Sequence, residues 1–129
     1  MRAIPFKIEH LAQYNSWLEA WEIKEIPTSD YYPSVGGFIV ENCAAAFLYL
    51  TNTSLAFCEH IVVNPAISRE DKTTSINLID DALNKFAKEN NVKLIVGRSF
   101  NNSFLERAKN RGWDISSKQF NMMYRKIGE

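Results

Sequence analysis

The sequence predicts a mixed α/β (α+β) fold, in which helices cover both faces of a mostly antiparallel sheet that includes one parallel pair of strands. Three apolar runs follow one another with only short polar turns between them, which indicates an antiparallel meander. A long amphipathic stretch with helical periodicity comes after the third run, and a fourth apolar run follows it. Because a helical crossover joins parallel strands, the third and fourth runs should pair in parallel.

The chain begins with a predicted helix from Ile8 to about Trp21. Its apolar residues recur at spacings of three and four, as on one helical face: Leu11, Tyr14, Leu18 and Trp21. Prolines and small polar residues end this pattern around Tyr31 and Tyr32, which predicts a loop or a short helical turn. This segment can act as a lid, and the two tyrosines are candidates for contacting a substrate or a partner.

The meander occupies the next part of the chain. Gly36-Gly37 opens the first predicted strand, residues 38–40, and Glu41-Asn42 makes the tight turn to the second strand, residues 44–50. The third strand, residues 55–63, is long and almost wholly apolar, so we expect it at the centre of the sheet.

A helix is predicted from about Arg69 to Asn90, because its apolar residues form one stripe and its charged residues lie elsewhere. Ser68 and Asp71 have the spacing of a capping box at its start. A short apolar run over residues 92–96 predicts the fourth strand, which we expect to be buried.

The last part of the chain predicts another helix and a closing strand. The helix covers residues 101–110, with Ser103 and Glu106 as its capping box and Gly112 as its stop. Alternation of apolar and polar residues from Gln119 to Ile127 predicts the strand.

Composition narrows the function classes. A chain of 129 residues with 46% hydrophobic content predicts one domain, residues 1–129. Fifteen basic residues balance fifteen acidic residues, so the net charge gives no general attraction to nucleic acid. No membrane-length apolar stretch appears. Cys43 and Cys58 lie in apolar runs without metal-ligand spacing, which predicts buried, reduced thiols, a cytoplasmic location and no metal site.

Three segments carry a family resemblance. Ile61-Val62-Val63-Asn64-Pro65 ends the third strand directly before the long helix, residues 101–113 read Asn-Asn-Ser-Phe-Leu-Glu-Arg-Ala-Lys-Asn-Arg-Gly-Trp, and residues 122–126 read Met-Met-Tyr-Arg-Lys. These segments resemble the V-x-P strand end, the N-x-x-A-x-x-x-Y-x-x-x-G-F segment and the closing strand of the GCN5-related N-acetyltransferase (GNAT) superfamily. The resemblance extends over residues 1–127 and is reminiscent of small GNAT-like proteins of tailed phages.

This resemblance implies transfer of an acyl group from acetyl-coenzyme A, or another acyl-coenzyme A, to the amine of a small molecule or protein. The chain departs from the family pattern at two functional positions. A glycine-free segment, residues 68–74, replaces the Q/R-x-x-G-x-G/A loop that holds the pyrophosphate. Ala108 stands where the family often has the tyrosine that protonates the leaving thiolate. The alternative is therefore a catalytically silent GNAT-fold interaction or regulatory protein, which can be a homodimer or bind a protein partner.

Glu59 is the candidate general base, because it is the only carboxylate within the central strand and partial burial favours a proton-accepting role. The alternative is an outward-facing Glu59 that is solvated or paired with a neighbour such as Lys72. By strand alternation His60 should face the opposite side from Glu59 and serve a structural role. Tyr124 is the candidate to replace the missing general acid.

Cofactor contacts follow from the resemblance and from the helix start. The resemblance implies that a backbone amide of Ile61 or Val63 polarises the thioester carbonyl and that Asn101 lies near the pantetheine arm, although Asn101 also suits plain N-capping. Helix-start amides and side chains can hold phosphates, whereas Glu70 and Asp71 would repel them; the candidate phosphate ligands are Ser68, Lys72, Thr73 and Thr74.

Overall fold

The computed structural model describes residues 1–23, 29–99, 101–116, 123 and 125–128. The chain divides into two compact units, Met1–Arg98 and Ser99–Glu129. The first unit contains the sheet and its two covering helices, and the second contains a single described helix. One domain over residues 1–129 stays a prediction.

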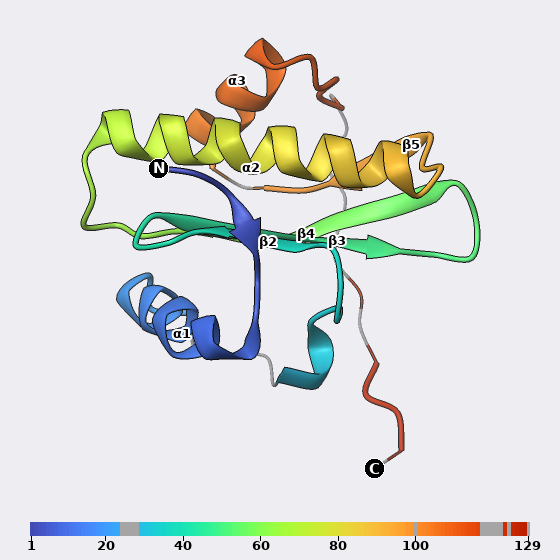
Figure 1. The fold of residues 1–129 in the computed structure, drawn as a ribbon, viewed down its shortest axis with the longest axis horizontal. Coiled ribbons are helices and arrows are strands. Elements are labelled where there is room, and N and C mark those ends of the chain that lie inside the picture. Colours follow the sequence, from blue (N-terminus) through green and yellow to red (C-terminus); the bar gives the residue numbers. More distant parts are fainter. Residues whose placement is uncertain (24–28, 100, 117–122, 124, 129) are drawn as a thin grey trace. The chain divides into compact units, whose positions relative to one another are not determined.

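Five strands form one sheet in chain order, and the arrangement confirms the predicted meander and crossover (Figure 1). All neighbouring strands are antiparallel except β4 and β5, which are parallel. The helix between them supplies the crossover. The strands are β1 (Ile4–Pro5), β2 (Gly37–Val40), β3 (Ala44–Leu50), β4 (Leu55–Val63) and β5 (Leu94–Gly97).

Helices cover both faces of this sheet, as predicted. A 3-10 turn, η1 (Ile8–His10), leads into α1 (Leu11–Ala20), and a second turn, η2 (Ser29–Tyr31), precedes β2. Figure 1 shows α1 and the long helix α2 (Arg69–Glu89) on opposite faces. We call these the α1 face and the α2 face. In the second unit, α3 covers Asn102–Asn110.

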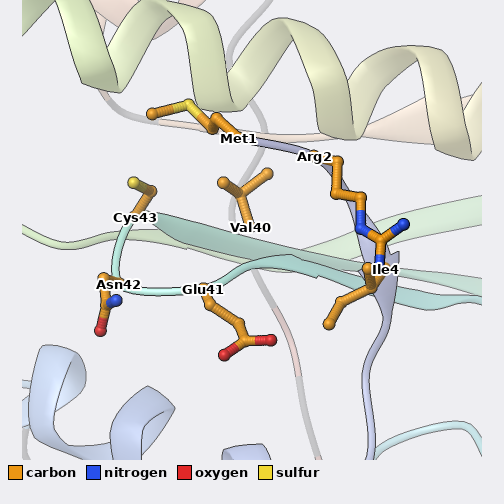
Figure 2. A pocket seen from close by; sticks show the side chains of 7 residues that line it. All are labelled: Met1, Arg2, Ile4, Val40, Glu41, Asn42 and Cys43. Atoms are coloured by element: carbon orange, nitrogen blue, oxygen red, sulfur yellow. The ribbon is translucent and has the colours of Figure 1, made fainter.

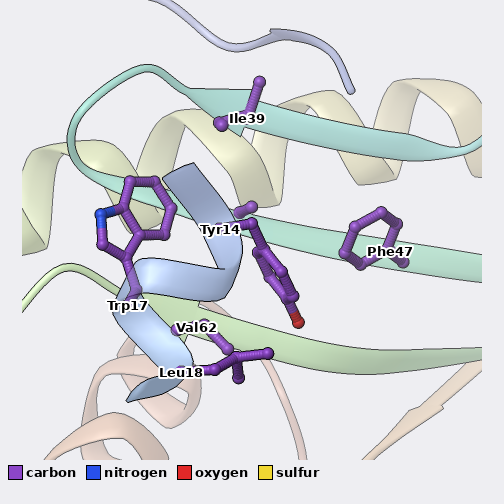
Figure 3. Close-up of a cluster of buried hydrophobic side chains, with 7 residues drawn as sticks. Tyr14, Trp17, Leu18, Ile39, Phe47 and Val62 are labelled. Atoms are coloured by element: carbon purple, nitrogen blue, oxygen red, sulfur yellow. The ribbon is translucent and has the colours of Figure 1, made fainter. Parts of the chain in front are cut away.

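The main core lies on the α1 face. Its fully buried members come from α1 and from the three central strands: Tyr14, Trp17, Leu18, Ile39, Ala45, Phe47 and Val62 (Figure 3). Burial of each large apolar side chain contributes about 1.5–3 kcal/mol. This cluster anchors β4 to α1, so the part of β4 that carries the candidate site has a fixed position.

On the α2 face, Ile79, Leu83 and Ala87 are buried as the predicted stripe requires. The ring of Phe86 packs edge-on against Phe38 of β2 at 5.9 Å between centroids. Gly36 precedes that strand with φ of 92°, and a Cβ there would lie 2.7 Å from the carbonyl oxygen of Leu48. Glycine is therefore needed at this entry to the sheet.

Two expectations about strands were incomplete or wrong. β1 was not predicted, because a two-residue strand has no periodic signal. β5 was expected to be buried, but Leu94 is 60% exposed and Val96 is 42% exposed. In the described part of the chain β5 is an edge strand with only β4 beside it.

The capping box at Ser103 and Glu106 was also wrong. Asn101 is the N-cap of α3, and its side-chain oxygen accepts a hydrogen bond from the Phe104 amide at 3.0 Å. Gly112, with φ of 95°, follows the helix as the predicted stop. Most of the expected closing strand, Gln119–Ile127, lies outside the described residues.

None of the helices in the described ranges combines the length and the apolar character needed to cross a membrane.

Candidate active site

The candidate site is centred on a β-bulge in β4. Ala45 of β3 pairs with Val62 and Phe47 pairs with Glu59, so a single β3 residue lies opposite both His60 and Ile61. His60 has φ of 57°, which is the left-handed region that few non-glycine residues adopt. A bulge of this kind changes the direction in which the following side chains point.

The bulge places His60 on the α1 face, together with Glu59. Glu59 pairs with Phe47, a residue of the α1-face core, and directly paired side chains share a face. The His60 ring contacts the rings of Tyr32 and Tyr49, with centroids 5.5 Å and 5.8 Å away. The prediction that His60 faces away from Glu59 was therefore wrong, because it assumed regular strand alternation.

Two aromatic side chains of the α1 segment bind backbone carbonyls of β4. The hydroxyl of Tyr14 donates a hydrogen bond to the His60 carbonyl at 2.8 Å. The indole N–H of Trp21 donates to the Val63 carbonyl at 2.6 Å. These bonds hold both ends of the irregular segment of β4 against α1.

β4 leaves β5 at the bulge. The parallel pairing ends at Cys58 and Gly97, and within the described ranges no strand pairs with residues 59–63 on the β5 side. The separation begins at Glu59, because β5 contains only four residues. Backbone groups of Ile61 and Val63, the predicted thioester contacts, thus lie on the part of β4 without a β5 partner.

An ion pair joins the two strands where they separate. Arg98, directly after β5, donates a hydrogen bond from Nε to Oε2 of Glu59 at 3.2 Å. The Glu59 side chain is 26% exposed and that of Arg98 is 57% exposed. The neighbour suggested from the sequence, Lys72, belongs to α2; Glu59 pairs instead with Arg98.

Two aromatic side chains, Tyr32 and Tyr49, contact the His60 ring on the α1 face. The Tyr49 hydroxyl donates a hydrogen bond to the Tyr31 carbonyl at 2.9 Å. The Tyr31 side chain itself is exposed. Tyr32 stacks on Phe47 with centroids 4.7 Å apart. The Tyr32 hydroxyl is buried, and burial raises its pKa, whereas the neighbouring Tyr14 hydroxyl opposes this shift. Of the two predicted contact residues, Tyr31 is thus exposed, whereas Tyr32 belongs largely to the core edge.

Burial shifts the pKa values of His60 and Tyr49. It lowers the pKa of His60 from the ordinary 6.5; the Glu59 carboxylate opposes this shift and the Arg98 guanidinium adds to it. Burial also raises the pKa of the Tyr49 hydroxyl, and the negative charge of Glu59 contributes. His60 is therefore neutral at pH 7, and Tyr49 keeps its proton.

The predicted phosphate-binding side chains lie at the start of α2. Ser68 is the N-cap, and its hydroxyl accepts a hydrogen bond from the Asp71 amide at 3.1 Å. The Thr73 hydroxyl donates to the Arg69 carbonyl at 3.1 Å. Lys72 is half-buried and Thr74 is exposed. Glu70 and Asp71 add two carboxylates to the same helical turn.

The remaining predicted site residues are not brought into this group by the described structure. Asn101 caps α3 within the second unit. Ala108 is on the same helix, so α3 itself carries no phenol at the position where the family often has its tyrosine. Tyr124 lies outside the described residues.

A separate depression of about 480 Å³ lies beside the β2–β3 turn. Figure 2 shows its lining residues, none of which is a predicted site residue: Met1, Arg2, Ile4, Val40, Glu41, Asn42 and Cys43. The carbonyl of Cys43 accepts a hydrogen bond from the Asn64 amide at 2.7 Å, so this depression borders the end of β4.

Neither of the two cysteines forms a disulfide bond. Cys43 and Cys58 are both buried and unpaired, as predicted for reduced thiols. Burial raises the pKa of the Cys58 thiol to about 12, so it stays protonated. Across the residues that the structure describes, no group of three or more histidine, cysteine, aspartate or glutamate side chains could hold a metal ion.

Comparison with solved structures decides the fold. A protein from Thermus thermophilus superposes with a TM-score of 0.71 at 15% identity, covering 100% of this chain and 99% of that one. The GNAT family protein of Streptococcus pneumoniae gives 0.64 at 13% identity, covering 98% of both chains. This chain has the GNAT fold.

A Trypanosoma brucei acetyltransferase gives a TM-score of 0.66 at 14% identity, covering 95% of this chain and 99% of that one. No protein-family model matches the sequence, and none of the curated proteins matches it. The GNAT fold is thus shared at low sequence identity.

Sequence reasoning missed two members of the site. Arg98 was not singled out, although a charged residue directly after a short apolar strand parallel to β4 is a signal that such a pair can form. His60 was assigned a structural role. The positive φ of a histidine in an otherwise regular strand has no local sequence signal, because no glycine marks the bulge.

Proposed function

We propose that this chain is an acyl-coenzyme A-dependent N-acetyltransferase that acts on an amine acceptor. The observation that supports this proposal best is the opened segment of β4, residues 59–63. It presents backbone polar groups without a β5 partner, beside the Glu59–Arg98 ion pair and on the face covered by α1. A carboxylate next to accessible backbone amides is the combination that amine acylation needs.

The residues present fit coenzyme A, which when bound would supply a thioester-activated acyl group. The edge of β4 that has no β5 partner suits the amide groups of a pantetheine arm, with Ile61 and Val63 as the proposed contacts. Trp21 occupies the Val63 carbonyl, so the amide of Val63 is the group offered there. The α2 start offers its helix dipole and Lys72 to phosphates, together with Ser68, Thr73 and Thr74. Glu70 and Asp71 weaken this end of the site.

Catalysis would divide among the residues as follows. A backbone amide of the opened β4 segment polarises the thioester carbonyl. Glu59 promotes loss of the amine proton, directly or through an intermediary such as water. Tyr124 is the proposed proton donor to the departing sulfur, and Asn101 is a proposed pantetheine contact. Tyr31, exposed beside Tyr32 and Tyr49, is the proposed contact for the acceptor.

One solved neighbour supports the choice of cofactor. An aminoglycoside N-acetyltransferase in complex with coenzyme A superposes with a TM-score of 0.59 at 13% identity, covering 95% of this chain and 98% of that one. Its described ligand makes an acyl-coenzyme A the first cofactor to test. We also propose a cytoplasmic location, because both thiols are unpaired.

The alternative is a catalytically silent GNAT-fold protein for interaction or regulation. Two observations favour it: the carboxylates of Glu70 and Asp71 at the phosphate end, and Ala108 in place of a phenol. Such a protein would bind coenzyme A weakly or not at all.

Measurements of acetyl-coenzyme A binding and of amine acylation distinguish the transferase from the catalytically silent alternative. Calorimetry measures binding, and release of free thiol measures turnover against a panel of primary amines. Under the transferase proposal, Glu59→Gln binds the cofactor with unchanged affinity and loses turnover. Glu41→Gln, in the exposed β2–β3 turn, serves as the charge-matched control and should behave as wild type. Turnover that is the same in Glu59→Gln and wild type would remove Glu59 from the reaction.

A further inference from the structure

His60 and Glu59 are neighbours on β4 that the bulge places on one face. The two side chains differ in whether their polar atoms already form hydrogen bonds. Glu59 Oε2 already accepts a hydrogen bond from the Arg98 guanidinium at 3.2 Å. The His60 ring makes only ring contacts to Tyr32 and Tyr49 within the described residues, so both of its nitrogens are available.

The backbone of His60 is held in an unfavourable conformation for a side-chain-bearing residue. Its φ of 57° costs free energy that the surrounding structure must offset. The buried Tyr14 hydroxyl binds the His60 carbonyl at 2.8 Å and helps to hold it. The result is an imidazole directed to the α1 face at the point where β4 and β5 separate, which regular alternation would not achieve.

We propose that His60 is the group that takes the proton from the acceptor amine, and that Glu59 acts on the amine only through His60. This inference rests on the proposed transferase function and names the intermediary between Glu59 and the amine. Glu59, fixed by Arg98, supplies the negative charge that stabilises the imidazolium once it forms.

The charges around the imidazole suit this role. Among the described residues, the titratable and charged groups beside the His60 ring are Glu59 on β4, Arg98 after β5, Tyr49 on β3 and Tyr32 after η2, and Tyr14 on α1 binds the His60 backbone. Because burial lowers the pKa of His60, its imidazole is neutral and able to accept a proton at pH 7. The three phenols are neutral at that pH and leave Glu59 and Arg98 as the charged groups.

The proton and electron balance is simple. His60 takes one proton from the ammonium group of the acceptor, and the freed lone pair on nitrogen forms the new N–C bond. The C–S bond of the thioester breaks with its electron pair on sulfur, and the second proton lost from nitrogen goes to that sulfur. The products are an amide and a free thiol, and His60 returns its proton to solvent.

His60→Asn is the informative variant, because asparagine tolerates positive φ but does not titrate. We expect kcat/KM for amine acylation to fall by about 100-fold or more, and the acid-side inflection of its pH profile to disappear. Acetyl-coenzyme A affinity should be unchanged. His10→Asn, the other histidine of the chain, is the matched control and should keep both the rate and the inflection.

A second readout needs no turnover. Imidazole ring signals of the ligand-free wild-type protein, followed by NMR between about pH 4 and pH 8, should show His60 titrating below 6.5 and shifting when Glu59 is changed to glutamine. His60→Gly, which also tolerates the backbone, should regain acylation when imidazole is added.

Three results would overturn the inference. His60→Asn acylating within about threefold of wild type with an intact acid-side inflection would exclude His60 as the base. A His60 ring whose NMR signals are the same in wild type and in Glu59→Gln would exclude the proposed action of Glu59 through His60, even if the His60 variants failed to fold. Failure of the wild type to bind acetyl-coenzyme A would reject the proposed function and, with it, the role of His60. Full activity in His60→Asn would reject only the role of His60.

Discussion

The hydroxyl of Tyr14 donates a hydrogen bond to the backbone carbonyl of His60 at 2.8 Å, and Tyr14 itself is completely buried. This bond connects the core of the α1 face to the bulge of β4. The Trp21 indole makes the corresponding bond to the Val63 carbonyl at the end of the strand. The irregular backbone that the proposed chemistry needs is therefore stabilised from one helical segment.

Tyr14→Phe should destabilise the protein by about 1–3 kcal/mol, because it leaves a part-buried carbonyl without its donor while keeping the ring in the core. Urea denaturation measures this free energy of unfolding. Trp21→Phe is the control, since its indole is 47% exposed and water can replace the lost donor at Val63. Equal losses in the two variants would show that the Tyr14 hydroxyl has no special role.

Arg98→Gln should change the free energy of unfolding by less than about 1 kcal/mol, because the Arg98 side chain is 57% exposed and water can solvate Glu59 in its place. Its turnover should fall by up to about 100-fold through loss of the position of Glu59. Arg98→Lys keeps the charge but loses the Nε donor, so its turnover should lie between that of wild type and that of Arg98→Gln. Large unfolding effects without an effect on turnover would make the ion pair purely structural.

Stability should decrease as pH falls below 6.5. The folded-state pKa of His60 is lowered, so the unfolded chain binds more protons between that pKa and 6.5. The stabilising contribution is thus complete above 6.5 and is lost as pH falls through the folded-state pKa. Thermal unfolding of wild type and His60→Asn at several pH values measures this, and the variant should show a weaker dependence. Parallel curves would contradict the lowered pKa.

Glu70→Gln should tighten coenzyme A binding by about twofold to fivefold, because a charge at a helix end is worth about 0.3–1 kcal/mol. The same variant should lose a similar amount of stability, since Glu70 complements the dipole of α2. Lys72→Gln should weaken binding. Calorimetry at low and high salt measures all three proteins, and affinity that is insensitive to both substitutions would place the phosphates elsewhere.

The parts of the fold that follow short-range rules were predictable from the sequence. The glycines at the start of β2, the turn after Val40 and the Ser68 cap each determine structure within a few residues. The crossover rule then gave the parallel pairing of β4 and β5.

The site itself depends on relationships that no local pattern encodes. The bulge adds one unpaired residue to β4 without a glycine, so the face taken by His60 was assigned wrongly. The pairing of Glu59 with Arg98 depends on where β5 ends in its parallel register, which sequence periodicity does not specify. At the start of α3, Asn101 and Ser103 both suited the N-cap from the sequence, and the structure selects Asn101.

The most direct test of the transferase account is calorimetric titration of the purified chain with acetyl-coenzyme A, followed by competition with coenzyme A. The account predicts one-to-one binding with a micromolar Kd, displaced by coenzyme A and unchanged in Glu59→Gln. Absence of binding at millimolar cofactor would contradict it and favour the catalytically silent alternative.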